Sequence, residues 1–310
     1  LFRSKRASRI PLLENSARWC FRADCKETMH HGTIAVPGWL RQPPSQNTLQ
    51  ATRSIMAAAL KIEPIPAFSD NYIWLLHDDT NAVVVDPGDA QVVLAALSKR
   101  NLSLQSILIT HHHFDHVGGI AALTEATHCE VWGPTNPKIT PVTHRVKEGD
   151  TLQVLGEPMH VLEVPGHTLD HIAYLGEGVL FCGDTLFAGG CGRVFEGTHP
   201  MMRSSLAKLR GLDPETKVYC AHEYTIANLQ FALAADPHNA TLAERMQLCS
   251  SLRERNIPTV PSLLADEIAT NPFLRWDAPS VVENLAAASR LKSPQSDDVF
   301  AGLRQWKDTF

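Results

Sequence analysis

Long apolar runs, paired cysteines and an excess of basic charge are all missing from this sequence of 310 residues. No apolar stretch approaches the ~18 residues of a membrane-spanning helix, so we expect no membrane association. The formal net charge is −5, which gives no electrostatic argument for nucleic-acid binding. The seven cysteines are odd in number and scattered, which favours free thiols over a disulfide framework. We therefore expect a cytoplasmic protein in a reducing compartment.

Residues 1–55 differ from the remainder of the chain. They carry a basic excess, contain breakers such as Pro43-Pro44 and show no sustained hydrophobic period. We expect this segment to be absent from the native product or disordered, with folded sequence starting near Met56. An organelle presequence is the alternative, although Glu14 and Asp24 are unusual in one.

The most informative stretch runs from Thr110 to Gly119 and places four histidines and one aspartate within six positions. It follows an apolar run at 106–110 that predicts a buried strand, and precedes an apolar run that predicts a helix over 120–127. Side chains alternate along extended backbone, so His111 and His113 should point to one side and His112 away from it. Asp115 and His116 then form a second group nearby.

This layout suits two metal ions, and imidazole and carboxylate ligands fit Zn²⁺ as well as Fe or Mn. The non-functional interpretation of this stretch is a set of surface histidines or an artificial tag, but a tag contains no aspartate.

The histidine stretch ends a predicted βαβ unit, with strands over 82–85 and 106–110 and a helix over 91–99. Sheets of this kind place ligands at the carboxyl ends of their strands. Asp86 ends the first of these strands, and we expect it to support a ligating histidine or simply to form a turn.

Three more predicted strands, over 160–164, 179–182 and 217–221, also end in a histidine or an aspartate. The side chains concerned are His167, Asp184 and His222. With the first histidine stretch, four strand ends therefore carry metal-ligand chemistry. We expect His171 to support the site rather than to bind metal.

The strand pattern stops after residue 225, and helices are predicted over 226–235, 242–255, 281–289 and 298–307. This predicts two domains, 56–225 for the metal site and 226–310 as a helical domain. A glycine-rich loop at 188–198 carries Arg193, which could bind a carboxylate. Arg275 lies in an irregular link, and Lys307 is interpreted as a simple surface charge.

These motifs resemble the metallo-β-lactamase superfamily and, within it, the glyoxalase II (hydroxyacylglutathione hydrolase) family. The resemblance spans residues 56–310 and includes the family-specific runs 69–72, 190–193, 195–198, 222–225 and 271–275. It implies an α+β fold, a four-layer αβ/βα sandwich followed by a small all-helical C-terminal domain.

The resemblance also implies the ligands and the reaction. His111, His113 and His167 would hold one divalent metal, and Asp115, His116 and His222 the second, with Asp184 bridging. Arg193, Phe195, Tyr224 and Arg275 would contact glutathione, although Arg193 and Phe195 depart from the Lys and Tyr of many eukaryotic members.

The expected reaction is hydrolysis of S-D-lactoylglutathione and other S-2-hydroxyacylglutathiones to D-lactate and glutathione, the second step of methylglyoxal detoxification. A hydroxide activated by the two metals would attack, with Asp115 and Asp184 catalytic. A mononuclear iron persulfide dioxygenase using His111, His167 and Asp184 is the alternative enzyme, and a metal-stabilised binding module the non-enzymatic one. We expect a monomer.

Overall fold

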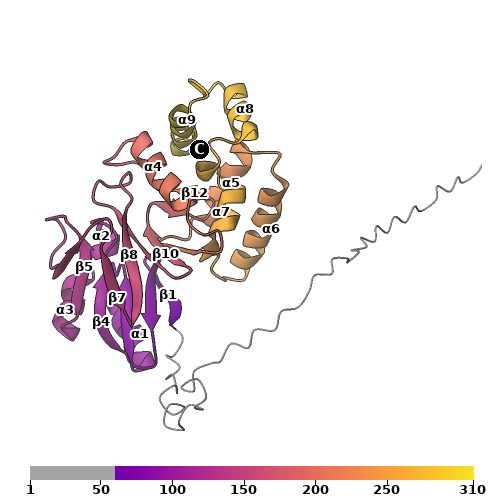
Figure 1. Cartoon of the computed structure of the whole chain (residues 1–310). Coiled ribbons are helices and arrows are strands. Elements are labelled where there is room, and N and C mark those ends of the chain that lie inside the picture. The colour runs from indigo at the N-terminus through magenta and orange to yellow at the C-terminus, as the bar shows by residue number, and fades with distance from the viewer. Residues whose placement is uncertain (1–59) are drawn as a thin grey trace, which may run out of the picture. The chain divides into compact units, whose positions relative to one another are not determined.

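The computed structural model describes residues 60–310 (Figure 1), so the expectation for residues 1–55 lies outside the described part of the chain. A first sheet contains six strands in the order β1 to β6. They are β1 (Lys61–Ala67), β2 (Asn71–His77), β3 (Asn81–Val85), β4 (Ser103–Leu108), β5 (Glu130–Pro134) and β6 (His144–Val146). The connection from β3 to β4 is the predicted parallel βαβ unit, with α1 (Ala90–Arg100) between them.

A second six-stranded sheet has the order β14-β13-β10-β9-β8-β7. Its strands are β7 (Thr151–Val154), β8 (Glu157–Glu163), β9 (Ile172–Gly176), β10 (Val179–Gly183), β13 (Lys217–Cys220) and β14 (Ser262–Leu263). The short hairpin of β11 (Leu186–Phe187) and β12 (Gly190–Cys191) follows β10. It begins the glycine-rich loop, which therefore stays close to the strand end that carries Asp184.

Alternation along the first sheet produces two separate cores. In β2, Trp74 and Leu76 belong to the core shared with the second sheet, whereas Ile73 and Leu75 face the helices on the other side. Successive strand side chains point to opposite faces, so a strand buried on both faces has a continuous apolar run, here from Tyr72 to Leu76 between the polar ends Asn71 and His77. All seven residues of β2 are buried accordingly.

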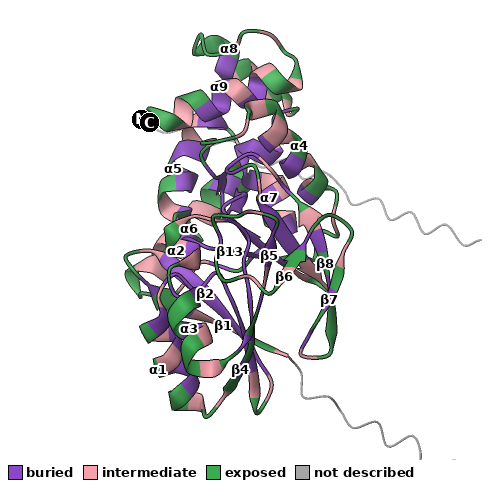
Figure 2. Cartoon of the chain, turned by 90° about the vertical axis from the view of Figure 1, so that its left-hand side faces the viewer, coloured by how far each residue is buried: buried purple, intermediate pink, exposed green. Residues whose placement is uncertain are grey.

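Helices cover the outer face of each sheet and complete the four layers. On the first sheet they are α1 and α3 (Ile120–Thr127), whose outward faces are exposed in Figure 2. On the second sheet it is α4 (His199–Arg210), whose Met202, Leu206 and Leu209 are buried in the cluster that includes the strands of this sheet. The predicted α+β sandwich is therefore confirmed.

The C-terminal part is helical, as expected, and lies at one end of the sheets in Figure 1. It comprises α5 (Thr225–Ala235), α6 (Ala240–Glu254), α7 (Leu264–Thr270), the 3₁₀ helix η2 (Pro272–Leu274), α8 (Pro279–Ala287) and α9 (Ser296–Asp308). Among residues 60–310, no helix combines the length and apolarity needed to cross a bilayer.

The structure contains two elements that the sequence interpretation lacks, one within the C-terminal part and one before it. Strands do not stop after residue 225, because β14 pairs with β13 and closes the edge of the second sheet. The twelve-residue helix α4 was not predicted, although Thr198 caps its N-terminus, Pro200 lies in its first turn and its buried residues recur at helical spacing.

Candidate metal centre

The histidine stretch is anchored directly behind β4 by Asp86. The Thr110 backbone N–H and hydroxyl both donate to the Asp86 carboxylate, over 2.8 and 2.7 Å. Asp86 Oδ2 also lies 3.1 Å from His116 Nδ1, on the short helix α2 (Phe114–Val117). Asp86 therefore supports a predicted ligand, as the sequence indicated, and holds the two ends of the stretch together.

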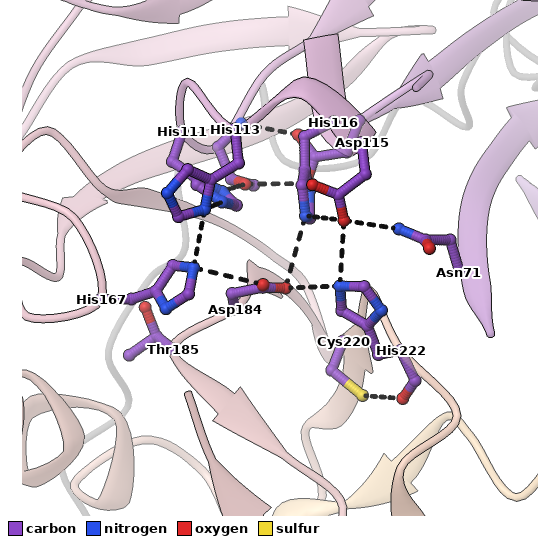
Figure 3. A network of polar contacts seen from close by, with 12 residues as sticks. Asn71, His111, His113, Asp115, His116, His167, Asp184, Thr185, Cys220 and His222 are labelled. Atoms are coloured by element: carbon purple, nitrogen blue, oxygen red, sulfur yellow. Dashed lines mark hydrogen bonds and ion pairs between the residues drawn. The ribbon is translucent and has the colours of Figure 1, made fainter. Parts of the chain in front are cut away.

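His111, His113 and His167 form the first group of side chains (Figure 3). His113 Nδ1 lies 3.1 Å from His111 Nε2 and 3.0 Å from His167 Nε2. Burial is the main cause that lowers the pKa of all three imidazoles, so they are neutral at physiological pH and offer lone pairs. Their mutual approach confirms the prediction that His111 and His113 point to the same side.

The second group contains Asp115, His116 and His222. Asp115 Oδ2 lies 3.4 Å from His116 Nε2 and 3.5 Å from His222 Nε2. Burial raises the pKa of the Asp115 carboxyl, but its contact with His116 outweighs this, and the pKa stays below its usual value. The carboxylate is therefore ionised at neutral pH.

Asp184 lies between the two groups. Its Oδ2 is 3.3 Å from His167 Nε2 in the first group, and its Oδ1 is 3.3 Å from His222 Nε2 in the second. Burial alone would raise the pKa of this carboxyl, yet the facing histidines hold it well below its usual value. One oxygen for each group is the placement expected of a bridging carboxylate.

A surrounding shell fixes the orientation of these side chains. Asp70 Oδ1 lies 2.8 Å from His222 Nδ1, and the Asn71 amide donates to Asp115 Oδ2 over 3.0 Å. His171 stacks on His111 with ring centroids 4.6 Å apart and accepts from the Asp184 backbone N–H over 3.1 Å. Burial, reinforced by His167, lowers the pKa of His171 to about 3, so its Nε2 is free to accept. His171 thus lies behind the site, in the supporting position expected for it.

The donor atoms fit divalent metal ions. Within residues 60–310, His116 Nε2 and Asp184 Oδ1 are buried without a hydrogen-bond partner. Such atoms are costly in a protein interior, and a bound cation satisfies them. Neutral imidazoles and carboxylates are ligands for Zn²⁺, Fe and Mn alike.

A cavity of about 440 Å³ opens from this centre towards the helical part of the chain. His167 and Asp184 line it, together with the predicted substrate residues Arg193, Phe195 and Tyr224. The Tyr224 ring stacks on His222 at 4.7 Å between centroids, and the Phe195 ring lies 5.3 Å from that of His167.

Two basic residues of α9, Arg304 and Lys307, also line this cavity. Lys307 is therefore not the simple surface charge that its sequence context indicated. Partial burial and the charges of Arg304 and Arg193 lower the pKa of its ammonium. Asp308 pairs with Arg304 over 3.0 Å and with Arg193 over 3.7 Å, so one carboxylate faces three cations and this wall keeps a net positive charge, which suits an anionic ligand. The sequence signal that could have identified these two cavity residues is their spacing of one turn, Arg304 and Lys307, on an amphipathic helix.

Arg275 is the one predicted substrate residue that does not line the cavity. Its Nε donates to Asp236 Oδ2 over 3.2 Å, and Asp236 is almost fully buried at the end of α5. The guanidinium thus compensates a buried carboxylate.

The described cysteines are all free and buried. Burial raises the pKa of Cys191, which lines the cavity, to about 11, and that of Cys220 to about 12. These thiols are protonated at neutral pH, so the chemistry rests on the histidines and carboxylates.

Two known protein families match successive parts of the chain. Residues 67–222 match the metallo-beta-lactamase superfamily, and residues 223–310 match the hydroxyacylglutathione hydrolase C-terminus. The chain is 51% identical over 253 residues to a hydroxyacylglutathione hydrolase of Idiomarina loihiensis, an alignment that covers 80% of this chain and 99% of that protein. It is 50% identical over 257 residues to a hydroxyacylglutathione hydrolase of Pseudomonas aeruginosa, covering 81% of this chain and all of the relative.

Solved structures share the fold. The BLEG-1 B3 metallo-beta-lactamase superposes with a TM-score of 0.52 at 24% identity, covering 69% of this chain and 99% of that one. A metallo-beta-lactamase from Staphylococcus aureus gives 0.53 at 20% identity, covering 81% and 72%. The fold and the histidine–aspartate centre define a member of the metallo-β-lactamase superfamily, which supports divalent metal binding. Within that superfamily, the chain belongs to the hydroxyacylglutathione hydrolase family.

Proposed function

We propose that this protein hydrolyses S-2-hydroxyacylglutathione thioesters, with S-D-lactoylglutathione as the principal substrate, to the hydroxy acid and glutathione. The observation that carries the proposal is the shared cavity. Asp184 and His167 of the metal centre line the same 440 Å³ space as the cations Arg193, Arg304 and Lys307. A reactive centre is thus joined to a site for an anionic substrate, and relatives about 50% identical bear this activity in their name.

Seven side chains are proposed to hold two divalent ions, with zinc preferred and iron or manganese as alternatives. They are His111, His113 and His167 for one ion, Asp115, His116 and His222 for the other, and Asp184 for both. Two such ions, when bound, would lower the pKa of a water to about 7 and so supply hydroxide at neutral pH.

The glutathione half of the substrate is anionic and is proposed to lie along the basic wall. Arg193 and Lys307 would receive its carboxylates, and Tyr224 and Phe195 would pack against its less polar parts. This geometry directs the thioester carbonyl towards Asp184 and His167. Holding the two reactants in one cavity removes part of the entropic barrier to their reaction.

Asp115 is proposed to handle the proton. Its carboxylate is ionised, so Oδ2 can accept a hydrogen bond from the attacking hydroxide and orient it while the new carbon–oxygen bond forms. The carbon–sulfur bond then breaks, and the proton of that hydroxide can pass through Asp115 to the departing sulfur, which leaves the hydroxy acid as a carboxylate and glutathione as a thiol. Asn71, which donates to Asp115 Oδ2, keeps that oxygen in place.

The iron persulfide dioxygenase is not favoured. It needs only His111, His167 and Asp184, whereas here Asp115, His116 and His222 converge as a second group. We further propose two domains, 56–225 and 226–310, with the substrate cavity between them, in a monomeric cytoplasmic protein whose partner is the small thioester alone.

The test is hydrolysis of S-D-lactoylglutathione by purified protein, followed by the loss of its ultraviolet absorbance. We expect turnover that chelation abolishes and that added zinc restores. Metal-loaded, folded protein without turnover would refute the thioesterase. Oxygen consumption with glutathione persulfide would then be measured, because the same fold with one iron predicts it.

A further inference from the structure

His112 is the one histidine of the 111–116 stretch that does not face the metal centre. Its side chain is only 9% exposed, and it points instead towards a separate polar cluster. The other members of this cluster come from three other loops: Asn136 and Lys138 between β5 and β6, Asp170 between β8 and β9, and Glu196 between β12 and α4.

The Nδ1 side of His112 binds the loop that carries His167. His112 Nδ1 lies 2.9 Å from Asp170 Oδ1, and the Asn136 amide donates to Asp170 Oδ2 over 2.8 Å. Since Asp170 can only accept while it is ionised, the imidazole donates through Nδ1. Asp170 is three residues beyond His167, so this bond restrains a loop that supplies a nitrogen to the first metal group.

The Nε2 side of His112 binds the loop that carries the substrate residues. Because the ring proton is on Nδ1, His112 Nε2 accepts from the Lys138 ammonium over 3.2 Å, and that ammonium donates in turn to Glu196 Oε1 over 3.3 Å. Glu196 directly follows Phe195 and lies three residues beyond Arg193. Its other oxygen accepts from the Leu169 backbone N–H over 3.1 Å, which joins the two loops to each other.

The cluster has the composition of a metal site, since His112, Asp170 and Glu196 could each offer a ligand atom. The contacts argue otherwise. The Lys138 ammonium already contacts both His112 and Glu196, and the Asn136 amide already donates a hydrogen bond to the Asp170 carboxylate. A metal ion at this place would be repelled by the Lys138 ammonium. The cluster is therefore better explained as a set of hydrogen bonds that restrain the surrounding loops.

We propose that His112 is a positioning residue with two separable arms: Nδ1, through Asp170, holds His167 in the first metal group, and Nε2, through Lys138 and Glu196, holds the Arg193–Phe195 segment over the cavity. The inference rests on the proposed metal ligands for its first arm and on the proposed substrate cavity for its second. Partners that orient ligating side chains typically change metal affinity 10- to 100-fold when they are removed.

Three substitutions separate the arms. His112→Ala removes both. His112→Asn places an amide where Nδ1 was and keeps the bond to Asp170, and His112→Gln places an amide where Nε2 was and keeps the contact with Lys138, which donates to Glu196. His160→Ala is the matched control, because His160 is an exposed histidine on β8 whose contact is with Thr151.

Zinc affinity is measured by competition with a chelator, and KM is measured with S-D-lactoylglutathione. We expect His112→Ala to weaken one of the two zinc ions about 10- to 100-fold and to raise KM. His112→Asn should keep the zinc affinity and raise KM, and His112→Gln should do the reverse. The control should change neither quantity.

Wild-type zinc affinity in His112→Ala would overturn the proposal, and so would Asn and Gln variants that behave alike. If His112→Ala fails to fold, Asp170→Asn tests the first arm with an unchanged shape, and it should weaken the same ion. Wild-type protein without thioesterase activity would refute the proposed function alone, because zinc affinity reports the first arm without turnover.

Discussion

Replacing Asp184 by Asn tests the centre most directly, because the change preserves shape and removes one charge. The Asp184 side chain is 9% exposed and faces ring nitrogens of His116, His167 and His222 at 3.3 to 3.6 Å. The amide N–H of the new Asn would face imidazole nitrogens that are expected to bind a metal ion. Removing one member of a buried charge pair costs about 3–5 kcal/mol. Because each 1.4 kcal/mol is tenfold in affinity, we expect metal binding to weaken by about two to four orders of magnitude.

The assay is metal content after gel filtration, combined with chelator competition and thioester hydrolysis on the same samples. We expect Asp184→Asn to lose ions from both groups and to lose turnover in proportion. Circular dichroism provides the control for folding. Asp184→Asn protein that retains both ions and full activity would show that this carboxylate does not bridge the two groups, and the assignment of the ligands would have to be revised.

Four further substitutions test other parts of the chain. Lys307→Met should raise KM about 10- to 100-fold with kcat unchanged, since a charge-assisted hydrogen bond is worth about 1.5–3 kcal/mol. Arg275→Met should leave KM unchanged but reduce the free energy of unfolding by about 3 kcal/mol, because a buried carboxylate loses its partner; a KM effect of the same size as that of Lys307→Met would place Arg275 in the substrate site after all. Glu267→Gln should destabilise the protein by about 3–5 kcal/mol in urea unfolding, since Glu267 is fully buried against Arg245 and accepts from the glycine-rich loop; equal stabilities would contradict this. Backbone N–H groups of the β2–β3 turn lower the pKa of Asp78 to about 2, so its contribution is complete above about pH 4 and is lost as the pH falls towards 2. Unfolding of wild type and Asp78→Asn across this range should show the stability difference shrinking, and a constant difference would refute it.

Local patterns in the sequence were sufficient to predict most of the sandwich. The strand and helix ends around the histidine stretch agree with the structure to within a few residues, because apolar periodicity and chain breakers act over short distances. The same-side placement of His111 and His113 also follows from neighbouring backbone geometry alone, as their 3.1 Å approach shows.

Segments with weak local signals were missed. The two-residue strand β14 has no periodicity of its own and exists because β13 offers an unpaired edge. Helix α4 is polar on its outer face and was obscured by the glycine-rich loop before it. β9 begins directly after His171, and its register is set by β8 and β10 on either side.

Pairings between distant segments were decided by the tertiary structure alone. Asp70 meets His222 across 152 residues, and no pattern in either segment specifies that contact. The same is true of the two basic candidates near the C-terminus. Arg275 follows the apolar pair Phe273-Leu274, and Lys307 lies between Trp306 and Asp308, yet Arg275 compensates the buried Asp236 and Lys307 faces the cavity.

The sequence, with the family resemblance it carries, indicated the candidate metal ligands and their two groups, because residue types, their order and the strands that end in them are local properties. Tertiary structure decided which distant side chains, such as Asp70, support those groups, which cations line the cavity and which polar contacts surround His112. Such choices depend on the packing of whole layers against one another, and that packing is the sum of many weak contacts rather than a property of any single stretch.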